Sequence, residues 1–302
     1  MKNMTYLSNA EVERVVLPNT RDLGGFEVRR ALPSAMRRMV GPFIFLDSFG
    51  PVTLEPGQGI DSRPHPHIGL ATLTYLVDGE LIHRDSESYV QPIGAGEVNV
   101  MVAGRGIVHS ERTSDTERAR TSKLFGFQSW VALPSEHEET EPGFQHIAAD
   151  DIPAVEGEGI RFKLLAGSLH GRRSPAKQFS ELFYGELVLG KGARYRIDGE
   201  HIERALFLSS GTISIGGQEG RFSDSRLIVF KPGAEIVITA VSPSRVIVLG
   251  GEPLPEKRHI QWNFVSTSED RIHEAARHWR ERRFPGVPGD SEFTPLPGDF
   301  NI

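Results

Sequence analysis

The chain has 302 residues, of which 38% are hydrophobic and 25% are charged, and these fractions are typical of a globular protein with a buried core. Its formal net charge of −6 argues against a surface that neutralises phosphate groups, and therefore against direct nucleic-acid binding. The chain contains no cysteine, which excludes disulfides, thiolate catalysis, cysteine-bound zinc and iron–sulfur clusters.

The chain shows no sign of a membrane segment. Residues 1–15 lack the continuous apolar stretch of a secretory signal, and the longest apolar runs, such as VGPFIFL, are too short to span a bilayer. We therefore expect a cytoplasmic protein that has no membrane partner. The length favours two domains, each large enough to bury its own core.

Strand-length runs rich in Val, Ile, Leu, Phe and Tyr occupy most of the chain from about residue 40 to 250. Because Gly and Pro punctuate these runs regularly, they predict antiparallel sandwiches or barrels rather than βαβ units. Residues 74–104 and 206–240 share one order of strand, glycine turn, strand, loop and strand. This similarity indicates an internal duplication of one β-barrel.

The stretch SRPHPHIGL contains His65 and His67 at the start of an apolar run. Side chains at positions i and i+2 of a strand point to the same side, so both imidazoles can face a barrel interior. Pro66 points the other way and donates no hydrogen bond, which suits the start of a strand. Alone, the pair is also consistent with a polar turn that holds one packed and one solvated histidine.

A second pair, His109 and Glu111, ends the strand-like segment AGRGIVHSE. It begins 42 residues after His67, which leaves room for about three short strands. In a small barrel, strands this far apart in sequence can be neighbours. Three imidazoles and one carboxylate that leave coordination positions open are typical of non-heme Fe(II) oxygenases.

An acidic stretch that contains prolines, residues 134–159, predicts the boundary between the two barrels. We therefore expect an N-terminal metal-binding barrel over residues 1–140 and a C-terminal barrel over 141–260. A helix and tail should follow over 261–302. In that last segment a capping box, Ser266 with Glu269 or Thr267 with Asp270, should begin a helix that ends near FPGVPGD. One face of this helix should be apolar through Ile272, Ala276 and Trp279.

These motifs together resemble the pirin family of bicupins. The resemblance runs from about residue 20 to 297 and rests on HPHIG, TYLVDGELIHRDS, AGRGIVHSE, GPFIFLDSFGP and WNFVSTSEDRI. It implies an all-β chain of two tandem cupin barrels, each a jelly-roll-like double-stranded β-helix. It further implies Fe(II) in the N-terminal barrel, with zinc, manganese, nickel, cobalt and copper as alternative metals. The implied ligands are His65, His67, His109 and Glu111.

The chain departs from the resemblance in two places. Pirins often carry a glutamate shortly after the H-x-H pair, and here Ala71 stands at that position, so Glu111 should supply the carboxylate ligand. The second barrel lacks an H-x-H pair and keeps only His201, which we expect to be a surface or hydrogen-bonded histidine in a metal-free barrel. His83, in GELIHRDS, is more typical of a strand surface than of a pocket.

The resemblance implies a quercetin 2,3-dioxygenase that cleaves a flavonol, or a similar small aromatic substrate, with O2. Glu111 would then act both as metal ligand and as catalytic base toward the substrate hydroxyl. Apolar strand residues such as Leu73, Tyr75, Val98, Val100 and Val108 are candidates to line the pocket, although half of such positions must face outward. One alternative is a non-enzymatic, iron-dependent redox sensor that binds a protein partner and regulates transcription or a metabolic enzyme. Another is a bicupin with a structural metal and a different small-molecule substrate.

Overall fold

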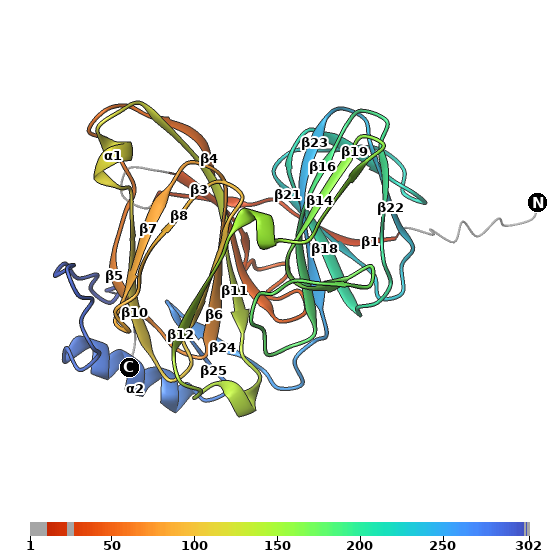
Figure 1. The fold of residues 1–302 in the computed structure, drawn as a ribbon. Coiled ribbons are helices and arrows are strands. Elements are labelled where there is room, and N and C mark those ends of the chain that lie inside the picture. The colour runs from red at the N-terminus through yellow and green to blue at the C-terminus, as the bar shows by residue number, and fades with distance from the viewer. Residues whose placement is uncertain (1–10, 23–26, 299, 301–302) are drawn as a thin grey trace, which may run out of the picture.

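Two β-barrels stand side by side, and each combines one large sheet with one four-stranded sheet (Figure 1). The computed structural model describes residues 11–22, 27–298 and 300. It confirms the predicted all-β class, with two tandem barrels and a short C-terminal helix. Among the described residues, no helix combines the length and the apolar character that crossing a bilayer requires.

The first barrel encloses its interior between a seven-stranded and a four-stranded sheet. The large sheet has the order β12 (Gly143–Ile147), β9 (Val98–Val102), β6 (Leu70–Asp78), β11 (Ser122–Ala132), β4 (Phe43–Leu54), β3 (Glu27–Leu32) and β2 (Asn19–Asp22). The small sheet has the order β5 (Asp61–His67), β10 (Ile107–Arg112), β7 (Leu81–Asp85) and β8 (Val90–Ile93). All pairs in both sheets are antiparallel.

The second barrel repeats this arrangement. Its large sheet has the order β1 (Val12–Val16), β21 (Arg226–Phe230), β18 (Glu203–Ser210), β23 (Ser244–Gly251), β16 (Leu182–Leu189), β14 (Ile160–Leu169) and β13 (Ala154–Gly157), and β15 (Arg172–Arg173) pairs with β14. Its small sheet has the order β17 (Arg194–Ile197), β22 (Ile236–Ala240), β19 (Thr212–Ile215) and β20 (Phe222–Ser223). The matching sheets agree with the internal similarity of residues 74–104 and 206–240.

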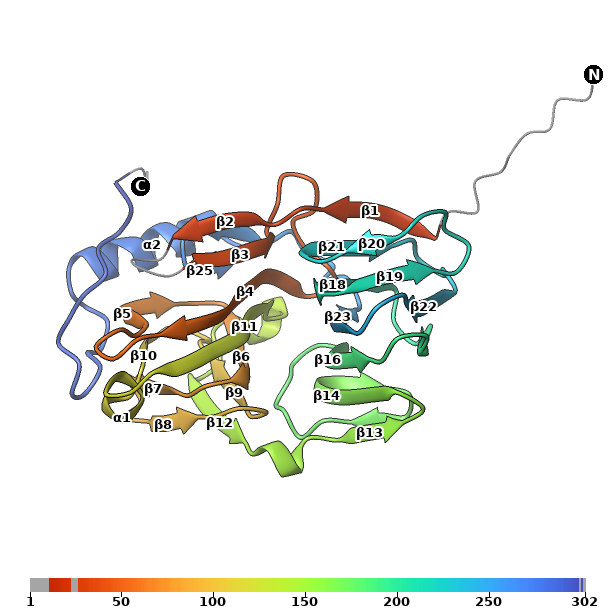
Figure 2. The same cartoon turned by 90° about the horizontal axis from the view of Figure 1, so that it is seen from above.

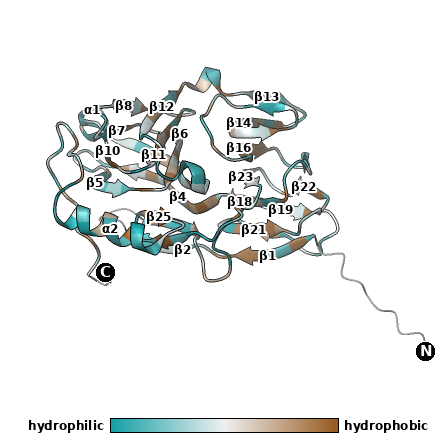
Figure 3. Cartoon of the chain, turned by 90° about the horizontal axis from the view of Figure 1, so that it is seen from below, coloured by the Kyte–Doolittle hydropathy of each residue, from teal (hydrophilic) through white to brown (hydrophobic). Residues whose placement is uncertain are grey.

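The two large sheets pack against each other through one hydrophobic core that both barrels share. Because side chains alternate along a strand, each large sheet presents one face to this shared core and the other to its own barrel. Leu73 and Tyr75 of β6 and Ile247 and Leu249 of β23 belong to the shared core. Seen from above, the barrels lie next to each other with β1, β2 and β3 along one side (Figure 2). Hydrophobic residues are concentrated on strands such as β1, β4 and β16, whereas much of α2 is hydrophilic (Figure 3).

The interiors of the two barrels differ in polarity. Apolar side chains from both sheets fill the second barrel, for example Phe183 and Val248 of its large sheet and Ile213 and Ile236 of its small sheet. The first barrel instead buries His67, His83, Asp85 and His109 on its small sheet. The same architecture therefore encloses an apolar core in one half and a polar site in the other.

The C-terminal helix α2 (Glu269–Arg280) follows a hairpin of β24 (His259–Gln261) and β25 (Phe264–Ser266). Ile272, Ala276 and Trp279 are buried, as predicted, and they pack beneath the first barrel against Ile68 and Val108. Both predicted capping boxes were wrong. The residue that caps the helix is Ser268, whose hydroxyl accepts the Arg271 amide, so the helix begins one or two residues later than the two boxes predicted.

Two strands pair across the predicted domain boundaries, which remain a prediction, and the C-terminal helix packs on the first barrel. β1 pairs with β21 of the second barrel, β12 pairs with β9 of the first, and α2 returns to the first barrel. Outside the sheets lie the one-turn helix α1 (Asp115–Arg118) and 3₁₀ turns at Ser135–His137 and Ala149–Asp151. Each barrel is therefore built from segments that are not contiguous in the chain.

We expect Phe127→Ala to lower the free energy of unfolding by about 3–5 kcal/mol, the usual cost of removing a buried phenylalanine side chain. Phe127 is fully buried in the shared core and meets Phe207 of the second barrel edge-on. Guanidinium chloride unfolding followed by tryptophan fluorescence would measure the change. Leu17→Ala, at a side chain that is 67% exposed, is the matched control and should change stability little. Equal stability of both variants would contradict the shared core.

Candidate metal centre

The pairing of β5 with β10 brings the two predicted residue pairs together. The strands are antiparallel neighbours, and His65 lies directly opposite His109. A bulge between His109 and Glu111 shifts the register, so Glu111 lies opposite Ser62. Four strands, β6 to β9, separate β5 from β10 in the chain, one more than the sequence suggested.

The three histidines form a compact group on the inner face of the small sheet. One ring nitrogen from each of His65, His67 and His109 lies within 4.8 Å of the others. The Nε2 atoms of His67 and His109 are 3.1 Å apart. His67 and His109 are fully buried, whereas His65 is half-buried at the edge of the cavity described below.

Backbone carbonyls orient two of these rings. The Nδ1 atom of His65 lies 2.7 Å from the carbonyl oxygen of Arg63, and that of His67 lies 3.1 Å from the carbonyl oxygen of Asn263. A carbonyl only accepts, so each Nδ1 must carry the proton and each Nε2 must present a lone pair. Metal-bound histidines are held in this way in proteins, which makes the group chemically fit for a transition-metal ion.

Burial keeps the three rings neutral. It lowers the pKa of His65, and it lowers the pKa values of His67 and His109 well below the ordinary value of histidine, with like-charge repulsion between the imidazoles adding to the effect. The Nδ1 atom of His109 is buried and has no hydrogen-bond partner among the described residues. Neutral imidazole is the form that binds metal, so the group is ready for an ion without first losing protons.

Glu111 lies in a second, overlapping group. Its carboxylate is within 4.8 Å of ring nitrogens of His83 and His109, but the group that contains His65 and His67 does not include it. Burial raises the pKa of Glu111, while its electrostatic interaction with His83 and a hydrogen bond from the Thr74 hydroxyl act in the opposite direction. The Thr74 Oγ1 lies 3.0 Å from Glu111 Oε1. The carboxylate is therefore held beside the histidines from the opposite sheet.

Thr74 has a second oxygen neighbour, Gln128 Oε1 at 2.8 Å. One hydroxyl proton cannot satisfy two acceptors, and the two ends of a glutamine amide are interchangeable in such an assignment. The consistent arrangement has the Gln128 amide donating to Thr74 and the Thr74 hydroxyl donating to Glu111. These two residues then hold Glu111 as a carboxylate.

The expectation that His83 lies on a strand surface was wrong. Its side chain is 3% exposed, its Nε2 lies 2.9 Å from Asp85 Oδ2, and its ring stacks on Phe144. Asp85 also accepts the backbone amides of Glu87 and Tyr89 through Oδ1. The signal was present in the sequence, because Leu81, His83 and Asp85 alternate on the buried face of β7.

The histidines line a cavity of about 790 Å³. Phe45 and Trp130 form one wall, with ring centroids 3.9 Å apart and nearly parallel planes, and Trp130 meets His67 edge-on. On the same side, Arg30 lies over the Phe45 ring and forms two hydrogen bonds with Asp47, whose pKa burial raises. Cavities of this size commonly enclose small organic ligands.

None of the five apolar residues predicted to line the pocket lies on the cavity wall. Leu73, Tyr75, Val98 and Val100 belong to the shared core between the barrels, and Val108 packs beneath α2. The prediction chose the wrong phase of the alternation, because both faces of the large sheet are buried and hydrophobicity alone cannot tell them apart.

The residue at position 71 also points away from the candidate site. Ala71 packs with Val102 and Leu133 on the opposite face of β6, while Thr74 is the residue of β6 that reaches Glu111. In the second barrel, His201 is buried and its Nε2 lies 3.0 Å from the carbonyl oxygen of Ser168. Of the two expectations for His201, a surface position or a hydrogen-bonded one, the structure shows the hydrogen-bonded one.

Comparisons with known proteins agree with this geometry. Residues 25–131 match the Pirin family model, and residues 184–285 match the model of the Pirin C-terminal cupin domain. The chain is 44% identical over 281 residues to a pirin-like protein of Caulobacter vibrioides, covering 92% of this chain and 96% of that protein. It is 37% identical over 272 residues to a protein of Pseudomonas aeruginosa named "putative quercetin 2,3-dioxygenase", covering 89% and 82%.

A solved structure gives the same picture of the fold. The crystal structure of a quercetin 2,3-dioxygenase from Acinetobacter baumannii superposes with a TM-score of 0.85 at 32% identity. The match covers 95% of this chain and 97% of that protein. The two barrels are therefore cupin barrels, as the sequence predicted.

We expect the metal-free protein to lose stability as the pH falls below about 6.5, the pKa of histidine in an unfolded chain. The folded state holds His65, His67 and His109 at lower pKa values, so only the unfolded state takes up protons there. Each such histidine can contribute a slope of up to about 1.4 kcal/mol per pH unit until its folded-state pKa is reached.

Denaturant unfolding between pH 7.5 and 5 in the presence of a chelator would measure this slope. A His67→Gln variant, which cannot be protonated at that position, should show a shallower slope. His273→Gln, on the half-buried surface of α2, is the matched control. A steeper loss of stability in His67→Gln than in the wild type would contradict the neutral, buried state of this ring.

Proposed function

The chain belongs to the pirin family, and from that premise we propose that it is a metal-dependent dioxygenase of the quercetin 2,3-dioxygenase type. We assign one metal ion, iron(II), to His65, His67, His109 and Glu111 in the first barrel. The substrate would be a flavonol or a similar small aromatic molecule, which O2 cleaves.

The observation that carries the proposal is the orientation of the histidines on the wall of a cavity. The Nδ1 protons of His65 and His67 are both committed to backbone carbonyls, so their lone pairs converge toward His109. A cavity of about 790 Å³ adjoins them and has room for a small aromatic molecule. The names of the relatives from Pseudomonas aeruginosa and Acinetobacter baumannii point to the same chemistry.

When bound, such an ion would supply Lewis acidity and the electrons that activate O2. The protein would supply a proton acceptor. The Thr74 hydroxyl donates to one carboxylate oxygen of Glu111 and holds the group beside the histidines, where it could accept the proton of the substrate hydroxyl. Because burial raises the pKa of Glu111, the carboxylate is a stronger base than an exposed glutamate.

The cavity walls favour an aromatic substrate with polar substituents. Phe45 and Trp130 form an apolar wall beside His67. The paired Arg30 and Asp47 offer hydrogen-bonding groups on the same side of the cavity. Such a site can exclude water from the reacting atoms while it accepts the hydroxyl groups of a phenolic ring.

We favour an enzyme over a regulatory iron protein because a redox sensor requires no cavity of this size beside its metal. The two functions differ in turnover. Oxygen consumption by the iron-loaded protein with quercetin, measured against the metal-free protein, would separate them. Binding of the flavonol without oxygen consumption would contradict the enzymatic proposal.

We expect the double variant His65→Ala, His109→Ala to lose its metal, because it removes two of the three imidazoles that face one point. Metal analysis after anaerobic loading should give about one equivalent for the wild type and well below a tenth of that for the variant, since each lost ligand weakens binding strongly. His201→Ala, a buried histidine of the second barrel, is the matched control and should keep the full equivalent. A double variant that retains one equivalent would contradict the assignment.

We expect Glu111→Gln to retain most of the metal, since an amide oxygen can still accept the Thr74 hydrogen bond and coordinate weakly. Turnover should fall by about 10²–10⁴, the usual contribution of a positioned base. Rates of oxygen consumption, expressed per bound metal ion, would separate the loss of a base from the loss of metal. Near-native turnover per metal ion would rule out Glu111 as the base.

A further inference from the structure

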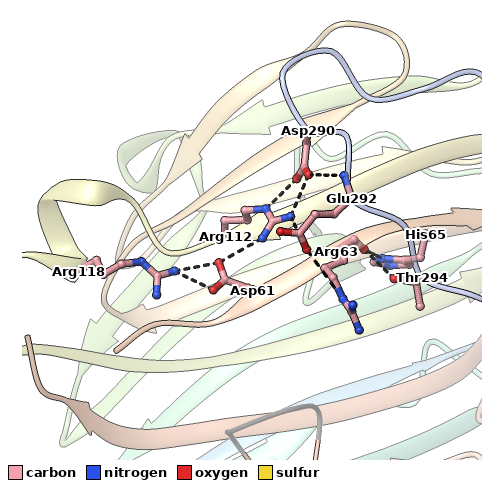
Figure 4. A network of polar contacts seen from close by, with 8 residues as sticks. All are labelled: Asp61, Arg63, His65, Arg112, Arg118, Asp290, Glu292 and Thr294. Atoms are coloured by element: carbon pink, nitrogen blue, oxygen red, sulfur yellow. Dashed lines mark hydrogen bonds and ion pairs between the residues drawn. The ribbon is translucent and has the colours of Figure 1, made fainter. Parts of the chain in front are cut away.

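The chain beyond the second barrel returns to the mouth of the cavity in the first. Glu292 and Thr294 line the cavity together with Ile260, Trp262 and Asn263 of the β24–β25 hairpin. Figure 4 shows residues 290–294 lying along β5, next to His65. We call residues 287–294 the C-terminal strap.

The strap reaches His65 through one shared carbonyl. The carbonyl oxygen of Arg63 accepts from His65 Nδ1 at 2.7 Å and from the Thr294 hydroxyl at 3.3 Å. In addition, the Thr294 amide donates to the carbonyl oxygen of Pro64 at 3.0 Å. Two hydrogen bonds from Thr294 therefore fix the peptide segment that sets the orientation of the His65 ring (Figure 4).

The hairpin before the strap orients the other histidine of the pair. Asn263, whose carbonyl oxygen accepts from His67 Nδ1, lies in the turn between β24 and β25. The hairpin is held close to the chain just after β5, because Val265 donates its amide to the carbonyl oxygen of Ile68. Gly69 makes this approach possible: a Cβ atom there would lie 2.0 Å from the Val265 carbonyl oxygen. Both histidines of the H-x-H pair thus depend on the C-terminal segment.

The strap has its own anchors. Arg112 forms two hydrogen bonds with Asp290, at 2.7 and 2.8 Å, and the Asp290 side chain is 7% exposed (Figure 4). At the other end, the Trp279 indole of α2 donates to the Thr294 carbonyl oxygen at 2.9 Å and stacks on Phe293. Paired, partly buried contacts of this kind hold a segment better than isolated surface ion pairs do.

From these contacts we propose that Thr294 is a positioning residue of the metal centre, and that docking of the C-terminal strap and metal binding strengthen each other. The inference rests on the proposed assignment of His65 and His67 as ligands. Since outer partners fix the tautomer and direction of a ligating histidine, a looser Arg63 carbonyl leaves the His65 ring less well aimed. Linkage requires that metal binding stabilise the docked strap by the same factor.

The test compares Thr294→Val with Thr294→Ser in the full-length protein, with Co(II) as the probe. Valine keeps the shape but removes the hydroxyl, and serine restores it. The Co(II) dissociation constant of Thr294→Val should rise by about threefold to tenfold, below the 10–100-fold typical of a direct partner of a ligand. Its d–d absorption spectrum should also change. Thr294→Ser should return both toward the wild type, and Thr53→Val, at an exposed threonine of β4, should match the wild type.

Hydrogen exchange gives a second readout that does not depend on activity. Co(II) should slow exchange in the peptide that contains the Thr294 amide in the wild type, and less so in Asp290→Asn, which weakens the anchor to Arg112. The proposal would be overturned if Thr294→Val showed the affinity and spectrum of the wild type. It would also be overturned if Co(II) left the hydrogen-exchange rate of the wild-type strap unchanged. Failure of the wild type to bind Co(II) would instead refute the metal centre itself, so the two failures are distinguishable.

Discussion

The antiparallel pairing of β5 with β10 is the constraint on which the candidate centre depends. It sets His65 opposite His109 and places His67 with its Nε2 atom 3.1 Å from that of His109. Removing imidazoles from water without giving them partners is costly. The fold limits this cost by giving two Nδ1 protons to backbone carbonyls and by keeping the rings neutral. What remains are the Nε2 lone pairs of His65 and His67 beside the His109 ring, an arrangement that a metal cation stabilises.

The two barrels show how one architecture serves two purposes. In the second, apolar side chains from both sheets fill most of the interior, so that barrel contributes stability and a large packing face. In the first, the inward face of the small sheet carries histidine and acid, and the interior stays open as a cavity. One face of the first barrel's large sheet packs in the shared core, and the other face, which carries polar residues, is turned toward the site. Thr74, Gln128 and Trp130 lie on this second face.

The centre also gathers contacts from distant parts of the chain. Thr74, itself hydrogen-bonded to Gln128, reaches Glu111 from the large sheet, and the carbonyl of Asn263 orients His67 from a hairpin 196 residues later. α2 likewise packs on the first barrel although it follows the second in the chain. Residues that follow the second barrel, such as Trp262 and Thr294, therefore form part of the cavity wall in the first barrel.

The sequence alone determined the class of fold, the two barrels and the residues most suited to bind a metal. It could do so because strand alternation and the H-x-H and H-x-E spacings are local patterns, and because the family motifs extend over nearly the whole chain. Only the tertiary structure decided which face of β6 is the inner one, where His83 points, and that contacts of Asn263 and Thr294 orient His67 and His65. Local patterns cannot decide these points, since both faces of the large sheet are buried and the supporting contacts come from carbonyls and hydroxyls up to 231 residues away.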